Sequence, residues 1–407
     1  MEQEIFSRND GRMVPGWLTR DVDRVDEILA ESKPYPFRHP DNLEDYVCLH
    51  QNDYLRLGER PEVRAAKTEA ILKEGNSFLA STIFAGSSAG DEHQAFRVLL
   101  SSAMQAEDVL LLSSGWTANV GLVEAIARPG VPIYLDQKVH ASLWDGARLS
   151  AGRPIMLRHN DPNFLEARIR RDGPGIVCID SFYSTTGAVC DLAAYVEICE
   201  KTGSVLILDE AHSLAMVGPG AGGLAVQLGL AERVHFRTAS FSKALGGHGG
   251  CIATTRHLAW FLTHRAHSVI FSSAVLPCDS AAHRTALAIA RAEPRLAGNC
   301  LEMGRLLRSD LRAVGVDVGD SACQIVSVQF PDCPTTCKAY GMLRDRGILG
   351  AVFMPPATPA GTGLIRFSLH ANLAESDMTR TAAAVGEVMQ ALGLQDQGHH
   401  HRSSAAA

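Results

Sequence analysis

Lysine is scarce in this sequence, and one of the seven lysines has unusual neighbours. Six of the seven lie in polar or amphipathic stretches, against 31 arginines in the chain. Lys243 instead follows a β-like run and precedes glycines and apolar residues, in Thr238-Ala-Ser-Phe-Ser-Lys-Ala-Leu-Gly-Gly-His-Gly-Gly250. Apolar surroundings lower the pKa of an amine and make it a better nucleophile. Lys243 is therefore a candidate nucleophile, with a solvated loop lysine as the alternative.

An acidic pair ends a strongly apolar run in Leu206-Ile-Leu-Asp-Glu-Ala-His-Ser213. Functional side chains collect at the carboxyl ends of strands in α/β sheets. Asp209 at this position could pair with a cationic ring nitrogen, and His212 could reach a neighbouring oxygen. The same four letters occur in helicase ATPases, but those enzymes need an upstream Gly-x-x-x-x-Gly-Lys-[Ser/Thr] loop, which this sequence lacks.

The two features together indicate pyridoxal phosphate. This cofactor needs a lysine for a Schiff base, a carboxylate to keep its ring nitrogen protonated, and a site for its phosphate. Asp209 and Lys243 are 34 residues apart, a spacing found in enzymes of the aminotransferase fold type. Ser113-Ser-Gly-Trp-Thr-Ala-Asn-Val120 follows an apolar run and opens a helix-like stretch, where backbone N–H groups could hold an anion.

Over roughly residues 45–390 the chain resembles the α-oxoamine synthases, pyridoxal phosphate enzymes that condense an amino acid with an acyl-CoA. The motifs that carry the resemblance occur in order: Asn52-Asp-Tyr-Leu55, Ser114-Gly-Trp-Thr-Ala-Asn119, His140-Ala-Ser-Leu-Trp-Asp-Gly146, Ser184-Thr-Thr-Gly187, Asp209 with His212, Ser240-Phe-Ser-Lys243, Phe271-Ser-Ser-Ala-Val-Leu-Pro277 and Leu364-Ile-Arg-Phe-Ser-Leu369.

The resemblance assigns the cofactor contacts. It places His140 stacked on the pyridine ring, Asp209 and His212 beside the ring, and Ser184 at the phenolic oxygen. The phosphate would be held by Ser114, Gly115, Trp116, Asn119 and Ser240, and by Ser272 and Ser273 of a partner subunit. The resemblance thus implies a homodimer with a shared active site.

The resemblance also assigns the substrate contacts. Arg366 would bind the carboxylate of the amino acid, and Asn52 would lie near the substrate. Lys243, Asp209, His140 and His212 would carry the chemistry. No metal is expected.

Departures from the family pattern point to one branch. Most members carry Gly-Ser-Arg-x-x-x-Gly upstream of the phosphate turn, whereas this chain has Ser81-Thr-Ile-Phe-Ala-Gly-Ser-Ser-Ala-Gly-Asp-Glu92. Thr185-Thr186 replaces the usual Met-Asp, and Gly220-Ala-Gly222 replaces Gly-Arg-Gly. These features resemble the autoinducer synthase branch, which makes α-hydroxyketone signals or their amino precursors. The missing arginine argues against ordinary glycine specificity.

The branch implies an S-adenosylmethionine- or 2-aminobutyrate-like amino acid, a medium-chain acyl-CoA and a decarboxylative condensation to an α-aminoketone. Two other functions stay open. One is a primary-metabolic synthase of the 8-amino-7-oxononanoate, 2-amino-3-ketobutyrate or 5-aminolevulinate type. The other is a non-catalytic regulatory protein with the same fold.

The sequence pattern around these residues predicts an α/β protein. Short apolar runs alternate with amphipathic stretches between about residues 46 and 275, which is typical of a mainly parallel sheet buried on both faces. The predicted strands lie at 108–113, 131–135, 154–157, 175–179, 204–208 and 235–239. We expect a large cofactor-binding domain over residues 46–279 and a smaller α+β domain over 280–395, which opens with a long helix over 280–311. An N-terminal arm (1–45, with a short helix near 17–31) and a low-complexity, disordered tail (396–407) flank them.

The composition argues against several other classes of protein. The 407 residues are 46% hydrophobic and carry a formal net charge of −7, which disfavours nucleic acid or an anionic membrane as a partner. The sequence has no apolar run of about 18 residues and no signal-peptide pattern at its N-terminus, so we expect no membrane insertion and a cytoplasmic location. Ten scattered cysteines, several in apolar runs, predict buried thiols.

Overall fold

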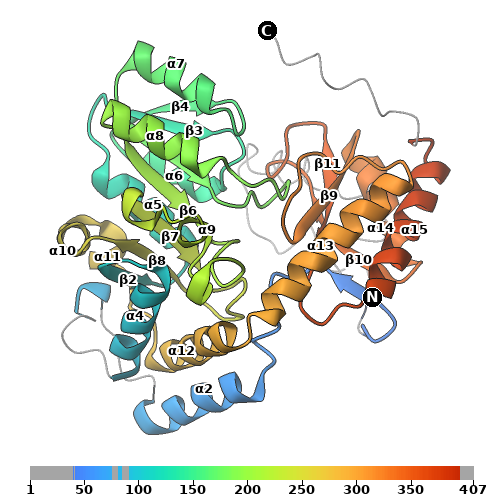
Figure 1. Cartoon of the computed structure of the whole chain (residues 1–407), viewed down its shortest axis with the longest axis horizontal. Coiled ribbons are helices and arrows are strands. Elements are labelled where there is room, and N and C mark those ends of the chain that lie inside the picture. The colour runs from blue at the N-terminus through green and yellow to red at the C-terminus, as the bar shows by residue number, and fades with distance from the viewer. Residues whose placement is uncertain (1–39, 41, 76–80, 85–90, 395–407) are drawn as a thin grey trace, which may run out of the picture.

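A computed structural model describes residues 40, 42–75, 81–84 and 91–394. It shows two lobes, each built on one sheet and joined by the helices α12 (Pro277–Ala292) and α13 (Arg295–Ala313) (Figure 1). We call the lobe around the seven-stranded sheet the large lobe and the lobe around the four-stranded sheet the small lobe. The predicted helix near residues 17–31, the tail and residues 85–90 of the segment with the missing arginine lie outside the described residues.

The large lobe has the predicted, mainly parallel sheet, with strand order β2-β8-β7-β6-β5-β3-β4. Only β8 runs against its neighbours, antiparallel to both β2 and β7. The strands are β2 (Asp108–Leu112), β3 (Pro132–Asp136), β4 (Arg153–Leu157), β5 (Ile176–Asp180), β6 (Val205–Asp209), β7 (Phe236–Ser240) and β8 (Gly250–Thr254). Most of the inner-strand residues are buried, as continuously apolar strands between helices require.

Helices connect and cover these strands. In Figure 1, α7 and α8 lie near one end of the sheet, and α4, α10 and α11 lie near β2 at the other end. The helices of this lobe are α2 (Pro61–Glu74), α4 (Asp91–Met104), α5 (Gly115–Ile126), α6 (Ala141–Leu149), α7 (Pro162–Asp172), α8 (Leu192–Thr202), α9 (Leu224–Gln227), α10 (Arg256–Arg265) and α11 (His267–Ile270). Side-chain caps fix several starts: Asp161 accepts a bond from the Phe164 amide at α7, and Asp191 does the same for Ala194 at α8.

The small lobe contains a sheet of order β1-β10-β11-β9. Its strands are β1 (Val47–Leu49), β9 (Ile325–Phe330), β10 (Ile348–Phe353) and β11 (Gly363–Ser368), with α14 (Cys333–Arg344) and α15 (Glu375–Ala391) packed beside them. β1 comes from the stretch that the sequence pattern assigned to the large domain, yet it pairs in parallel with β10. The reason is that backbone pairing can join segments some 300 residues apart in the chain, and an apolar pattern does not name its partner.

The predicted single helix over residues 280–311 is two helices. α12 ends at Ala292 and α13 begins at Arg295, with Pro294 between them. Proline lacks an N–H donor and its ring clashes with the preceding turn, so a continuous helix through this position is disfavoured. The break lets the chain change direction between the two lobes (Figure 1).

None of the described helices combines the length and apolar character that a membrane span requires. All ten cysteines are free thiols; eight are buried, and Cys48 and Cys333 are half-buried.

A buried ion pair lies behind the carboxyl end of β6. Glu210 is 0% exposed and Arg237 of β7 is 2% exposed, and Glu210 Oε2 lies 3.6 Å from Arg237 Nη1. Glu210 also accepts a bond from the Ala225 amide at 3.0 Å, which fixes the start of α9. The pair therefore ties two central strands to a short helix.

We expect Glu210→Gln to lower the free energy of unfolding by about 3–5 kcal/mol, because it leaves the Arg237 charge buried without a counter-charge. Urea denaturation followed by circular dichroism measures this. Glu200→Gln is the matched control, since Glu200 pairs with Arg233 on the surface and its loss should cost at most about 1 kcal/mol. Equal effects of the two substitutions would show that burial of the first pair has no energetic consequence.

Candidate active site

The predicted acid and lysine meet at one edge of the large sheet. Asp209 is the last residue of β6 and pairs in register with Thr238 of the parallel neighbour β7. Ser240 ends β7, and Lys243 follows three residues later. Parallel strands end at a common edge, so this topology brings the Asp-Glu-Ala-His and Ser-Phe-Ser-Lys motifs together.

A short chain of hydrogen bonds orients the Asp209 carboxylate. Asn119 of α5 donates from Nδ2 to Asp209 Oδ2 at 2.6 Å, and the Ala211 amide donates to Oδ1 at 2.8 Å. The Asn119 amide is itself fixed, because Thr238 Oγ1 donates to its Oδ1 at 2.6 Å and its Nδ2 also reaches Ser142 Oγ at 2.9 Å. All of these side chains are buried, so the carboxylate is held in one orientation.

His140 is joined to the same network. It caps α6, and its Nδ1 lies 2.7 Å from Ser142 Oγ. The Trp116 ring stands edge-on to the His140 ring, with 5.6 Å between centroids. Desolvation lowers the pKa of His140 and the nearby Lys243 lowers it further, against an opposing effect of Asp209. These groups favour a neutral ring at the edge of the site.

His212 follows Asp209 by three residues and is buried. Its Nδ1 is hydrogen-bonded to Tyr54 Oη at 2.7 Å, and Gln324 Nε2 of the small lobe donates to its backbone carbonyl at 2.8 Å. Burial lowers its pKa well below the usual value, and the positive charges of Lys243 and Arg366 act in the same direction. His212 is therefore a neutral hydrogen-bonding group.

Lys243 has the environment predicted for a nucleophilic amine. Its neighbours Phe241, Ala244 and Leu245 are all at most 2% exposed. Burial lowers the pKa of Lys243, the positive charge of Arg366 lowers it further, and Asp209 opposes both. Within the described part of the chain, no group forms a hydrogen bond or ion pair with its Nζ, so the amine is available to bind a carbonyl compound.

Arg366 of β11 brings a buried positive charge from the small lobe. It is 5% exposed; its Nη2 donates to Asn52 Oδ1 at 2.9 Å and its Nη1 to the Ser184 carbonyl at 3.1 Å. The guanidinium lies over the Phe353 ring, 4.6 Å from the centroid, and its buried Nε has no hydrogen-bonding partner among the described residues. None of the carboxylates in the described ranges pairs with it. A buried cation without a counter-ion is costly, and an anionic substrate would remove that cost.

A cradle for an anion lies where α5 begins. Ser114 caps this helix by accepting from the Thr117 amide at 3.0 Å. A Cβ added at Gly115 would lie 2.8 Å from Ser240 Cβ, and one at Gly250 would lie 2.4 Å from the Gly115 nitrogen. Only glycine allows the helix start to approach the end of β7 and the start of β8 this closely, and a helix N-terminus is suited to hold a phosphate.

The residues present thus fit pyridoxal phosphate: an amine for the Schiff base, an oriented carboxylate, a flat neutral ring and an anion cradle. Among the predicted residues the structure brings Asn119, His140 and Asp209 together through bonds, and joins Asn52 to Arg366. Ser184 contacts Arg366 through its backbone carbonyl. Ser272 and Ser273 lie beside residues 81–82, through the Thr82 amide and the Ser81–Ser273 bridge.

Sequence reasoning missed four residues that hold the site: Tyr54, Ser142, Thr238 and Gln324. Three of them had a signal, because Tyr54 and Ser142 lie inside quoted motifs and Thr238 stands five residues before Lys243. Gln324 had none, since nothing in its local sequence indicates a contact with His212.

Comparison with known proteins agrees with this geometry. The family model described as aminotransferase class I and II matches residues 44–385. The CAI-1 autoinducer synthase of Vibrio campbellii is 33% identical over 341 residues, covering 84% of this chain and 86% of that protein. The 8-amino-7-oxononanoate synthase of Mycolicibacterium vanbaalenii is 34% identical over 344 residues, covering 84% and 89%.

A solved structure supports the fold. Serine palmitoyltransferase from S. paucimobilis superposes with a TM-score of 0.87 at 23% identity, covering 94% of this chain and 100% of that one. The family match, the relatives and the cofactor-binding geometry lead to one conclusion: the chain belongs to the α-oxoamine synthases, pyridoxal phosphate enzymes of aminotransferase class I and II.

Proposed function

We propose that the protein joins an α-amino acid to a medium-chain acyl-CoA, with loss of CO₂, to form the α-aminoketone precursor of an α-hydroxyketone autoinducer. The observation that carries the proposal is Arg366, a buried guanidinium that lacks a carboxylate partner among the described residues and lies close enough to affect the pKa of Lys243. It is suited to hold an amino-acid carboxylate next to the reactive amine. The similarity to the CAI-1 autoinducer synthase supports the finer assignment, for which we propose an S-adenosylmethionine- or 2-aminobutyrate-like amino acid.

The second candidate is a primary-metabolic synthase, favoured by the similarity to 8-amino-7-oxononanoate synthases at up to 34% identity. It uses the same residues with a different amino acid and acyl chain. The non-catalytic alternative is disfavoured, because Lys243, Asp209 and Arg366 are all present in a connected site.

The residues divide the work as follows. Bound pyridoxal phosphate supplies an electron sink for negative charge at the amino-acid Cα. Asp209 would pair with its ring nitrogen, His140 would cover one ring face, and Ser240 with the start of α5 would hold the phosphate. Arg366 holds the substrate carboxylate, and the Lys243 amine, once free, removes the Cα proton. Cα then bonds to the acyl carbon, CoA leaves as its thiol, the carboxylate carbon departs as CO₂, and Cα takes up a proton in its place.

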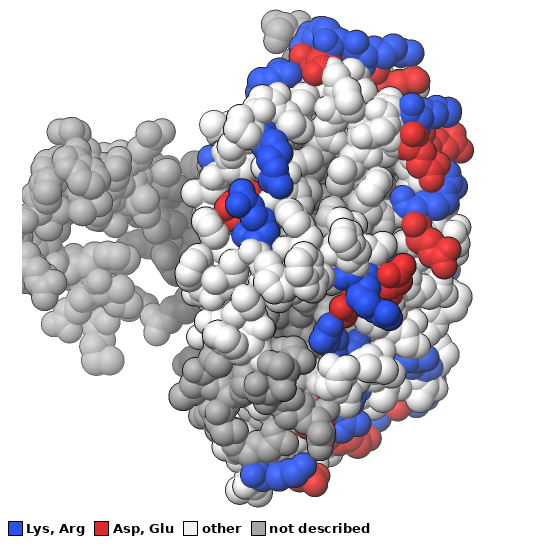
Figure 2. All heavy atoms as spheres, turned by 90° about the vertical axis from the view of Figure 1, so that its left-hand side faces the viewer, with Lys and Arg blue, Asp and Glu red and all other residues white. Residues whose placement is uncertain are grey.

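We also propose a cytoplasmic homodimer. Phe84 and Phe271 are 58% and 78% exposed on neighbouring segments, and Trp260 is 63% exposed. Figure 2 shows a face of the molecule on which charged side chains stand in separate groups with uncharged surface between them. Exposed apolar side chains on neighbouring segments, as Phe84 and Phe271 are, are typical of protein interfaces. If a second subunit binds at the Phe271 side, Ser272 and Ser273 of this chain would lie at the phosphate site of that subunit.

The test of the function is product analysis. Purified enzyme incubated with a mixed pool of amino acids and acyl-CoAs should yield, by mass spectrometry, an α-aminoketone with a medium-length chain. Lys243→Ala is the control and should give neither product nor the yellow colour of bound cofactor. A product built on glycine, serine or alanine would instead establish the primary-metabolic function.

Asp209→Asn should keep bound cofactor and lose about 10²–10³-fold in kcat, the scale seen when a preorganised electrostatic partner is removed. The neutral amide cannot hold the proton on the ring nitrogen. Cofactor absorbance and steady-state kinetics measure the two properties separately. A kcat close to that of the unaltered enzyme would contradict the role assigned to Asp209.

Arg366→Lys should raise the KM for the amino acid about ten- to a hundredfold, since a lost charge-assisted pair costs about 1.5–3 kcal/mol. The KM for acyl-CoA should change much less. Arg380→Lys is the control, because Arg380 is exposed and bonds only to backbone carbonyls. If Arg366 has a purely structural role, the melting temperature falls and both KM values stay the same.

A further inference from the structure

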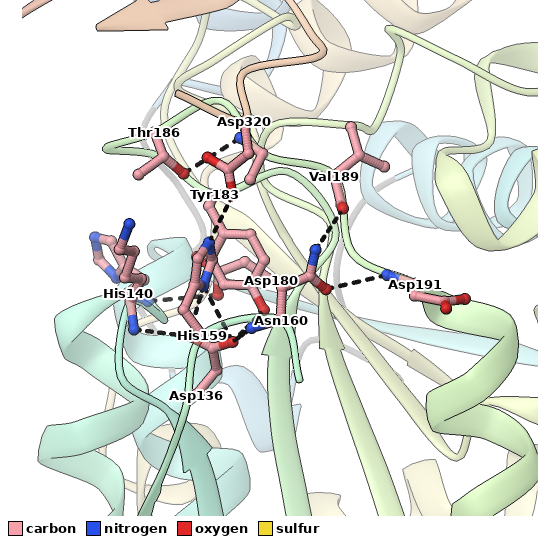
Figure 3. Close-up of polar contacts among 12 residues, drawn as sticks. Asp136, His140, His159, Asn160, Asp180, Tyr183, Thr186, Val189, Asp191 and Asp320 are labelled. Atoms are coloured by element: carbon pink, nitrogen blue, oxygen red, sulfur yellow. Dashed lines mark hydrogen bonds and ion pairs between the residues drawn. The ribbon is translucent and has the colours of Figure 1, made fainter. Parts of the chain in front are cut away.

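A polar cluster outside the catalytic site joins the two lobes, and its centre is Asp136 at the end of β3. Asp136 is 0% exposed and accepts bonds from the Lys138 amide at 2.8 Å, the Asn160 amide at 2.6 Å and Tyr183 Oη at 2.9 Å. Its fourth partner is His159, whose Nδ1 lies 3.0 Å from Oδ1. Figure 3 shows the His159 ring between Asp136 and Asp320 of the small lobe.

Tyr183 opens a tight turn that supports the substrate arginine. The turn is closed by bonds from the Tyr183 amide to the Ala188 carbonyl at 2.9 Å and from the Gly187 amide to the Tyr183 carbonyl at 2.8 Å. Its second residue is Ser184, whose carbonyl accepts the bond from Arg366. The position of the turn therefore sets where the guanidinium lies.

The same turn is in direct contact with the small lobe. The Ala322 amide donates to the Gly187 carbonyl at 2.8 Å. Gly187 has a φ of +71°, and a Cβ there would lie 2.0 Å from the Ile325 carbonyl oxygen. The backbones of the two lobes thus meet at this turn, and small relative shifts of the lobes would move it.

His159 spans this junction. Its Nε2 lies 3.5 Å from Asp320 Oδ2, two residues from Ala322, and its ring stands edge-on to Tyr183 with 4.4 Å between centroids. The His159 side chain is 10% exposed and that of Asp320 is 54% exposed. We infer that His159 is a positioning residue: its imidazolium form ties Asp136 to Asp320, seats the Tyr183–Ala188 turn between the lobes, and so aligns Arg366 for the amino-acid carboxylate.

The surrounding charges favour the protonated form. Burial would lower the pKa of His159, but the hydrogen-bonded Asp136 and the ion-pair partner Asp320 outweigh burial and raise the pKa above the usual value, against a small opposing effect of Lys138. Asp136, Lys138, Tyr183 and Asp320 are the titratable groups that face the ring. For a histidine with a raised pKa in the folded protein, the stabilisation is complete below about pH 6.5 and is lost as the pH rises through the folded value.

The test uses Asp320→Asn, because Asp320 is half-exposed and its loss leaves the Asp136 bonds intact. Melting temperature is measured at about pH 6 and about pH 9, one on each side of the ordinary histidine pKa. The affinity for 2-aminobutyrate is measured at the same pH values from the absorbance change of the bound cofactor. Asp345→Asn is the matched control, since Asp345 is an exposed small-lobe carboxylate that pairs only with Arg344.

At about pH 6, Asp320→Asn should lower the melting temperature and weaken 2-aminobutyrate binding about two- to fivefold, the scale of one partly exposed ion pair. At about pH 9 the variant and the unaltered protein should converge in both properties. The control should show no such pH dependence, and the KM for acyl-CoA should stay the same. A difference that is equal at both pH values, or no difference at either, would overturn the inference.

The link to Arg366 rests on the proposed function, and the two can fail separately. If the unaltered enzyme does not bind 2-aminobutyrate or any amino acid, the proposed function fails, and the pH-dependent melting temperature still decides whether His159 ties the lobes. If Arg366→Lys weakens amino-acid binding but Asp320→Asn changes neither property with pH, the proposed function stands and the role of His159 is refuted.

Discussion

A guanidinium buried between two lobes governs the architecture of this site. Arg366 comes from the small lobe, yet one of its partners is the carbonyl of Ser184 in the large lobe, and none of the described carboxylates neutralises it. The cost of such a charge is several kcal/mol unless an anion arrives. Binding of the substrate carboxylate and the relative placement of the two lobes therefore both depend on the charge of Arg366. The contacts at Gly187 and Gln324 hold the two lobes together around this guanidinium.

Burial and neighbouring charges together decide the pKa values of three histidines of the large lobe. Burial lowers the pKa values of His140 and His212, and the positive charge of Lys243 acts in the same direction, so both are neutral groups beside the cofactor site. His159 lies between two carboxylates, and its pKa is raised. The pKa values of these three histidines thus shift in different directions, because burial dominates at His140 and His212 whereas the flanking carboxylates outweigh burial at His159.

Much of the fold followed from the sequence because buried parallel strands have a simple signature. Continuous apolar runs between amphipathic stretches predicted β2 to β7, and all of these strands are present. β8 was missed, because Gly250-Cys-Ile-Ala-Thr254 follows a glycine-rich segment that reads as a loop. Two features could not be predicted in this way. The partner of β1 is set by long-range pairing, which an apolar pattern does not reveal. The break at Pro294 was missed because a proline inside a helical pattern was given too little weight.

The residues of the site also fall into two groups, those that local sequence indicates and those that depend on long-range contacts. Asp209 and Lys243 could be found from local sequence, because a strand-end carboxylate and a lysine among apolar residues are chemically unusual wherever they occur. Tyr54, Gln324 and the Asp136–His159–Asp320 cluster could not, because each works only through a residue far along the chain. The orientation of the His212 ring depends on a hydrogen bond from Tyr54, more than 150 positions earlier, and the turn that carries Ser184 depends on backbone from the small lobe. In this protein the reactive groups are local features, whereas the groups that orient them are products of the tertiary fold.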